Sequence, residues 1–230
     1  MKAWIGTSGY TYDWNKAKPS AFEWYLMQGF NSVEINASFY RFPSKNWMKA
    51  WSKAPSSFRF AIKVHRSITH YARLRGRAVE LFNKFADILK PMDYRIRFWL
   101  FQMPPSFIYS DDNLKIVKEF ASMFDDDRFV IEFRDPSWWQ YADKINEFAI
   151  FCSVDAPDLP RDIIASNNKV YLRLHGRYIW YSYLYEENEL DEIIDNINNL
   201  GLEEVAIYLN NDHGMLANGL YLLERFKNYL

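Results

Sequence analysis

The strongest constraint on the fold is a regular alternation of strand-like runs with helical stretches along the 230 residues. Apolar, β-branched and aromatic runs of strand length indicate eight strands. They lie at about residues 3–8, 32–36, 58–64, 96–103, 129–134, 150–155, 169–175 and 204–210. This alternation predicts an α/β fold, which is either a doubly wound sheet or a (β/α)8 barrel.

Helical stretches with start and stop signals fill the gaps between these runs. Ser20 and Ser44 can each cap a helix, and Gly29 can end the first of them. Amphipathic segments are expected at 45–53, 79–89, 111–121, 145–149, 190–197 and 220–229. The connection after the sixth run has room for only one helical turn, at 161–165.

Four of the strand-like runs close on two polar residues spaced two apart. The pairs are Glu34 with Asn36, Lys63 with His65, Glu132 with Arg134, and Arg173 with His175. This spacing puts both members of a pair on one face of a strand. A barrel collects strand ends all round its rim, whereas an open sheet concentrates function at one switch point. Because the pairs are spread over four runs, we predict a single-domain (β/α)8 TIM barrel over residues 1–230.

In such a barrel, the inward residues at the C-terminal ends of the strands line the active site. The mixture of carboxylates, cations and imidazoles suits acid–base catalysis, for which we predict Glu34, Lys63, Glu132, Asp155 and His175. Arg134 and Arg173 are expected to clamp a phosphate or carboxylate. The further candidates for substrate or anion binding are Ser8, Asn36, Tyr40, His70, Gln102, Trp138, Asn210 and Asn211. The alternative is a closed ring of salt bridges in which each arginine is fully engaged by a carboxylate.

Composition narrows the class of protein. The net charge of −1 gives no global attraction to nucleic acid or membrane, and no apolar stretch is long enough to span a bilayer. The single cysteine excludes an intramolecular disulfide framework, and the scattered histidines lack metal-site spacing. We therefore expect no cofactor, no tightly bound structural metal and no membrane partner. The start of the chain shows no signal peptide, so a cytoplasmic location is expected.

The quoted segments resemble, in order, the motifs of the domain of unknown function 72 family, also called YecE-like. Gly6–Trp14 resembles the opening GTSGWxYxxW, and Val33–Arg41 resembles VEINxTFY. The other matching blocks are Phe60–Lys63 with Ile68–His70, Phe101–Phe107, Glu132–Trp138, Asp155, Tyr171–Gly176 and Asn210–Asn211. The resemblance implies a TIM barrel but no activity. Asp135 stands where the family usually has His, and the segment after Trp14 lacks the usual GxFYP.

Three functions stay open at this point. The first is an enzyme acting on a small anionic or sugar-like substrate, with hydrolase, lyase or isomerase chemistry. The second is a protein that binds or processes nucleic acid through loop aromatics and arginines. The third is a ligand sensor without catalysis, because a fold does not fix a function. We favour the first, because acids, bases and arginines converge at the expected barrel mouth.

Overall fold

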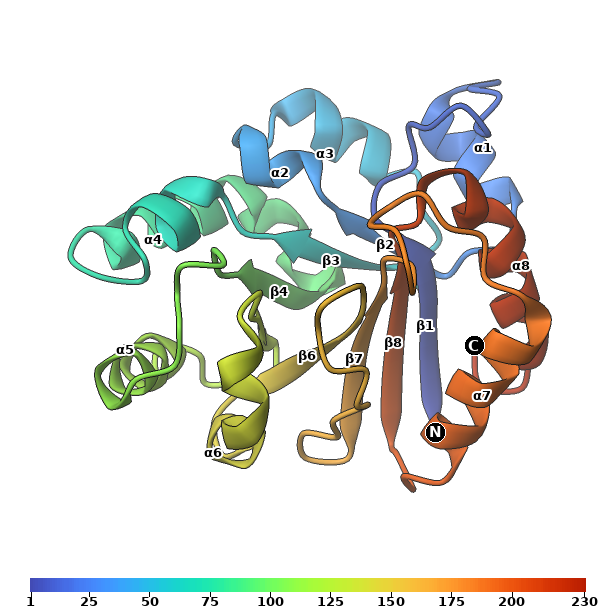
Figure 1. Ribbon diagram of the computed structural model, residues 1–230. Helices are drawn as coiled ribbons and strands as arrows, with labels where there is room; N and C mark the ends of the chain where they lie inside the picture. The colour runs from blue at the N-terminus through green and yellow to red at the C-terminus, as the bar shows by residue number, and fades with distance from the viewer.

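The computed structural model describes residues 1–230 and shows one parallel sheet that curls into a nearly closed barrel (Figure 1). The strands are β1 (Lys2–Thr7), β2 (Ser32–Ile35), β3 (Arg59–Lys63), β4 (Ile96–Gln102), β5 (Phe129–Glu132), β6 (Ile150–Asp155), β7 (Lys169–Leu174) and β8 (Glu204–Leu209). Their order in the sheet is β1-β8-β7-β6-β5-β4-β3-β2. The predicted barrel is confirmed, because every expected strand is present and its neighbours are parallel.

Helices surround the barrel and cover its outer face (Figure 1). They are α1 (Ala21–Met27), α2 (Ala37–Tyr40), α3 (Lys45–Trp51), α4 (Ala78–Leu89), α5 (Asp111–Ala121), α6 (Ala142–Asn146), α7 (Glu187–Asn198) and α8 (Met215–Arg225). The Ser20 and Ser44 hydroxyls accept hydrogen bonds from the third residue on, as predicted for N-caps. None of these helices has the length and apolar character that crossing a bilayer requires.

The connection between β6 and β7 is abbreviated, as predicted, and residues 161–165 do not form even the one helical turn for which there was room. Instead, the Ile164 N–H donates to the Ser153 hydroxyl at 2.9 Å, which ties this segment to β6 in an irregular conformation. Short helical pieces that the sequence did not predict lie elsewhere. They are a π-helical turn at Ser67–Tyr71 and 3-10 helices at Lys90–Arg95, Pro136–Tyr141 and Asp212–Gly214.

Two hydrophobic clusters show which strand side chains point toward the barrel axis and which point toward the helices. One lies between the sheet and the helices, and the other fills the barrel interior with residues such as Phe98, Val130 and Tyr171. Side chains alternate along a strand, so residues two or four positions further on also point inward. This rule directs Gln102, Glu132 and Arg173 to the axis near the C-terminal mouth.

The barrel closes between β1 and β2 with side chains in place of a backbone ladder. The Ile5 N–H donates to Asn31 Oδ1 at 2.8 Å, and Asn31 Nδ2 donates to the Ala3 carbonyl at 2.8 Å. The Tyr25 hydroxyl accepts from the Thr7 N–H at 3.0 Å and donates to the Ser32 carbonyl at 2.8 Å. Only near the mouth do the backbones pair directly, through the bridge between Ser8 and Glu34. We refer to this β1–β2 contact as the seam.

Gly6 allows the seam to form, because a Cβ atom there would lie 2.3 Å from the Ser32 carbonyl oxygen. We expect Gly6→Ala to push β1 from β2 and lower the free energy of unfolding by about 3 kcal/mol, through overpacking and lost hydrogen bonds. Urea denaturation measures this. Gly29→Ala is the control, because its φ of +91° is strained but nothing lies within 4 Å of an added Cβ. Equal losses for the two variants would contradict a tight seam.

Candidate active site

A buried ion-paired group forms the floor of the barrel mouth. Glu34 on β2, Glu132 on β5 and Arg173 on β7 have 0% exposure. Arg173 donates to both Glu34 oxygens, from Nη2 at 2.7 Å and from Nε at 3.0 Å. Its Nη1 donates to Glu132 Oε2 at 2.5 Å. One guanidinium thus joins carboxylates from two separate strands, and no ligand can reach it.

Neighbouring groups complete the hydrogen bonding of the two carboxylates. Ser8 Oγ donates to Glu34 at 2.8 Å, and the Tyr171 hydroxyl donates to Glu34 at 2.7 Å. Arg134 Nε donates to the other oxygen of Glu132. Burial raises the pKa of Glu132, but Arg134, Arg173 and Lys63 together outweigh it and lower that pKa to about 2. Glu132 is therefore a fixed anion at neutral pH and not a proton carrier.

Lys63, at the end of β3, is the unpaired member of the group. It is 9% exposed, and its Nζ lies 4.5 Å from the Phe39 ring centroid without a hydrogen bond or ion pair to the protein. Burial and the positive charge of Arg173 lower the pKa of this amine to about 7, although Glu132 and Glu34 partly compensate. A substantial fraction of the Lys63 amine is therefore uncharged at neutral pH.

His175 and Arg134 lie beside this amine. Burial, together with the charges of Arg173, Arg134 and Lys63, lowers the pKa of His175 well below its usual value, so the imidazole is neutral. Its Nδ1 lies 3.1 Å from the Asn210 amide, which fixes the ring. Arg134 has a side-chain exposure of 9%. Its Nε donates to Glu132 and its Nη2 lies 3.5 Å from His175 Nε2, whereas its Nη1 has no protein partner. Arg134 is thus the arginine of the site that can still bind a ligand.

A half-buried rim lies above the floor. Burial lowers the pKa of His70 to about 4, and the positive charges of Lys63 and Arg134 act in the same direction. Asn36 and Gln102 each have a buried amide oxygen without a hydrogen-bond partner, so two acceptors near the mouth are unsatisfied. Tyr40 is 63% exposed further out, with the Arg66 guanidinium 5.9 Å from its ring centroid.

Asp155 does not belong to this group, so its predicted place in the shared pocket is wrong. Cys152 and Val154 fill the barrel interior, which turns Asp155 to the outer face of β6. There it faces Arg177 Nε at 3.3 Å and Arg161 Nε at 3.9 Å. Residues of α7 line the same outer cavity.

Trp138 and Asn211 are also turned away from the mouth, contrary to their predicted binding roles. The Trp138 ring is fully buried between Phe133 at 3.8 Å and Phe107 at 5.7 Å, so neither face is free. The Asn211 amide donates to the Tyr183 carbonyl and to Asn218, each at 2.8 Å. Both residues hold loops in place.

Two tryptophans at the mouth were not among the predicted site residues. Trp180, in the segment after β7, lies under the Arg134 guanidinium at 4.7 Å and against the His175 ring at 5.4 Å. Trp139 also packs on the interior cluster, and its buried Nε1 has no partner. Trp139 could have been suspected because it follows β5, but no motif singles out Trp180.

The acidic side chains do not gather into a metal-binding set. No three His, Cys, Asp or Glu side chains lie close enough together to hold an ion, and Glu34 and Glu132 are bonded to arginine. The expected lack of a structural metal stays a prediction.

Comparison with known proteins places the chain among proteins of this fold. Residues 4–230 match the model of a family described as protein of unknown function DUF72. The chain is 26% identical over 233 residues to the UPF0759 protein YunF of Bacillus subtilis, with 85% of this chain and 83% of YunF covered. A DUF72 family protein (TM1631) from Thermotoga maritima superposes with a TM-score of 0.85 at 24% identity, covering 99% of this chain and 100% of that one.

A more distant structure shares the barrel. It is a xylose isomerase domain containing protein from Salmonella typhimurium, with a TM-score of 0.61 at 12% identity. The superposition covers 99% of this chain and 96% of that protein. The likeness extends to the fold alone.

Proposed function

Because the chain belongs to the DUF72 family, whose description names no activity, we propose a function from the site itself. The protein is an enzyme that moves a proton on a small anionic substrate at the barrel mouth. Lys63 carries the proton, and Arg134 binds the anionic group. The observation that carries this proposal is the nearly buried Lys63 amine, which has no protein partner and a pKa of about 7.

The chemistry follows from which groups are already occupied. A proton carrier works best when its pKa lies near the working pH, which Lys63 satisfies and Glu132 does not. Glu34 and Glu132 have their oxygens engaged by Arg173, Arg134, Ser8 and Tyr171, so they act as fixed charges. The arrangement of one amine base, Lys63, beside one cation that binds the anionic group, Arg134, suits abstraction of a proton followed by isomerisation or elimination. The neutral His70 imidazole can form a hydrogen bond with a substrate, whereas the two ring nitrogens of His175 already face Asn210 and Arg134.

The test measures Lys63 directly. We expect trace acetylation, read by peptide mass spectrometry, to label Lys63 with a midpoint at about pH 7. Millimolar phosphate or pyruvate should slow this labelling and raise the melting temperature, because a bound ligand stabilises the fold by mass action. Arg134→Gln should abolish both anion effects. Arg177→Gln, which removes an arginine from the outer side of the wall, should preserve them.

The proposal fails if neither anion protects Lys63 or raises the melting temperature and no small molecule co-purifies with the protein. An acetylation midpoint for Lys63 equal to that of exposed Lys16 would also reject Lys63 as the proton carrier.

A second candidate, nucleic-acid binding, rests on one local feature. Arg66, Arg73 and Arg75 in the β3–α4 connection form no ion pair, although the whole chain has a net charge of −1. Arg66 also lies 5.8 Å from the ring centroid of exposed Tyr71. Salt-sensitive binding of a single-stranded oligonucleotide, measured by fluorescence anisotropy, would favour this candidate over a small substrate.

A further inference from the structure

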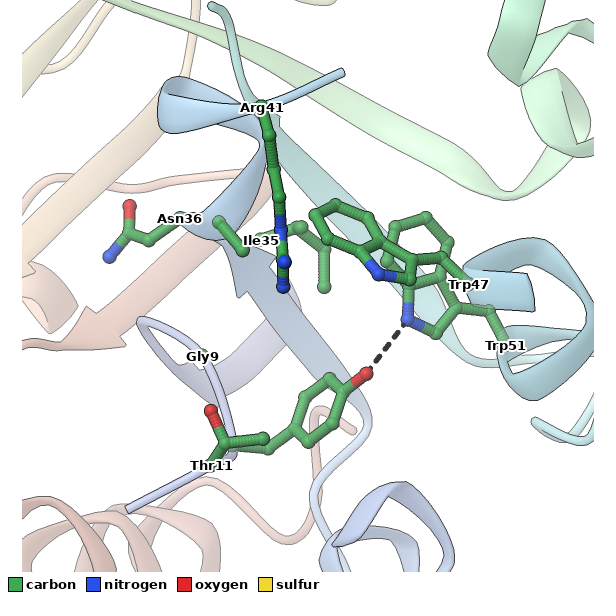
Figure 2. Close-up of a pocket in the computed structure, with 9 residues that line it drawn as sticks. Gly9, Thr11, Ile35, Asn36, Arg41, Trp47 and Trp51 are labelled. Carbon is green, nitrogen blue, oxygen red and sulfur yellow. Dashed lines mark hydrogen bonds between the residues drawn. The ribbon is translucent and has the colours of Figure 1, made fainter. Parts of the chain in front are cut away.

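A separate cavity lies behind β2, on the side opposite the ion-paired floor. Its volume is about 140 Å³, and its lining includes Tyr10, Thr11, Ile35, Arg41, Trp47 and Trp51. Ile35 points outward from β2, whereas Glu34 points inward, so the strand separates this cavity from the barrel mouth. Figure 2 shows the Arg41 side chain reaching down beside Ile35 on the side of the two indole rings, with the Asn36 amide directed away from them.

Arg41 is the charged group of this cavity and has no protein partner. It makes no hydrogen bond and no ion pair, and its guanidinium lies 4.9 Å from the Trp47 ring centroid. Stacking on the indole leaves the edge of the guanidinium free. That edge carries paired N–H donors, which match the two oxygens of a carboxylate.

The walls of the cavity are aromatic side chains that contacts within the protein hold in position. Trp51 is 1% exposed, and its Nε1 donates to the Tyr10 hydroxyl at 3.0 Å, which holds the two rings together (Figure 2). Trp47 packs on Trp51 with ring centroids 5.6 Å apart. An apolar cavity of roughly 150 Å³ is large enough for benzene. The space behind β2 therefore suits one six-membered ring.

We propose that this cavity is a second ligand site, which takes a small carboxylate attached to a single aromatic ring. The ring lies against Ile35, Tyr10 and Trp47, and the carboxylate accepts two hydrogen bonds from Arg41. The unpartnered Thr11 hydroxyl at the edge can serve a further polar substituent. The proposal is independent of the chemistry at Lys63.

Benzoate is the probe, and isothermal titration calorimetry with ligand-observed NMR is the measurement. We expect one saturable site with a Kd of about 1 mM or lower. Acetate supplies the charge without the ring, and benzyl alcohol supplies the ring without the charge, so both should bind at least about tenfold more weakly. Arg41→Gln should weaken benzoate binding by a similar factor. Arg66→Gln, which removes another arginine stacked on an aromatic ring, should not.

Further variants separate this site from the barrel mouth. Arg134→Gln and Lys63→Met should leave benzoate binding unchanged, whatever they do to phosphate or pyruvate. Loss of benzoate binding in Arg134→Gln with retention in Arg41→Gln would place the ligand at the mouth and overturn the proposal. So would equal affinities for benzoate and benzyl alcohol, because Arg41 would then contribute nothing. Absence of saturable benzoate binding in the native protein would overturn it as well.

Discussion

Arg173→Met should be the most destabilising single substitution at the barrel mouth. Removing the guanidinium leaves Glu34 and Glu132 in the interior without their shared cation, and breaking a buried ion pair in this way costs about 3–5 kcal/mol. For a chain of this size each kcal/mol corresponds to about 2–4 °C, so the melting temperature should fall by roughly 6–20 °C. Differential scanning calorimetry of wild type and variant measures the change.

The control is Arg225→Met, which breaks an exposed pair with Asp191. Surface ion pairs contribute little, so this variant should melt close to the wild type. The triple variant Glu34→Gln, Glu132→Gln, Arg173→Met should recover part of the loss, because it removes the stranded charges as well. If Arg173→Met melts no lower than Arg225→Met, the buried group does not stabilise the fold as its geometry implies.

Lys63→Met should raise the free energy of unfolding at pH 6, whereas Arg173→Met lowers it. The pKa of Lys63 falls from 10.5 to about 7 on folding, so the folded state disfavours the protonated amine. One pKa unit corresponds to about 1.4 kcal/mol, and the full penalty is therefore on the order of 3–5 kcal/mol. Below pH 7 both states hold the proton and the penalty is complete. Between pH 7 and 10.5 only the unfolded state binds the proton, so wild-type stability rises with pH.

Urea denaturation at pH 6, 8 and 10 checks this prediction. The stability gained from Lys63→Met should be largest at pH 6 and shrink steadily towards pH 10. Lys16→Met, at an exposed loop position, should give no such trend. A Lys63→Met protein that is less stable than wild type at pH 6 would show that the amine has an unrecognised partner.

The sequence predicts the fold well because the β/α alternation and the capping residues are local signals. It also predicts which strand ends carry polar groups, and the structure brings Glu34, Lys63, Glu132, Arg134, Arg173 and His175 together. The two-residue spacing fails at His65, although Arg134 keeps to it beyond the end of β5. β3 ends at Lys63, and His65 turns aside to Ser67 and packs on Phe42 rather than facing the mouth.

Other errors arise where both faces of a strand are buried. Asp155 ends a run in which Cys152, Val154 and their neighbours are all buried, so the sequence does not reveal which face is inward. The different roles of Arg134 and Arg173 could not be predicted from the sequence either. Spacing places Arg134 and Arg173 on the same face, but only the tertiary distances show that Arg173 is enclosed and that Arg134 retains a free nitrogen.

Along most of its length the seam is held by the side chains of Asn31 and Tyr25 rather than by a row of peptide hydrogen bonds, and Ser8 and Glu34 join it only near the mouth. Parting β1 from β2 breaks the links made by Asn31 and Tyr25 and leaves the hydrogen-bonded ladders between the other strands intact. Local opening costs the least free energy where few hydrogen bonds must break together, so we expect the barrel to open locally along the seam. Ser8 and Glu34 lie on opposite sides of it. Each such opening would admit water from the side to the ion-paired floor. Slow local opening of the seam would therefore change the electrostatic environment of the charged groups at the mouth.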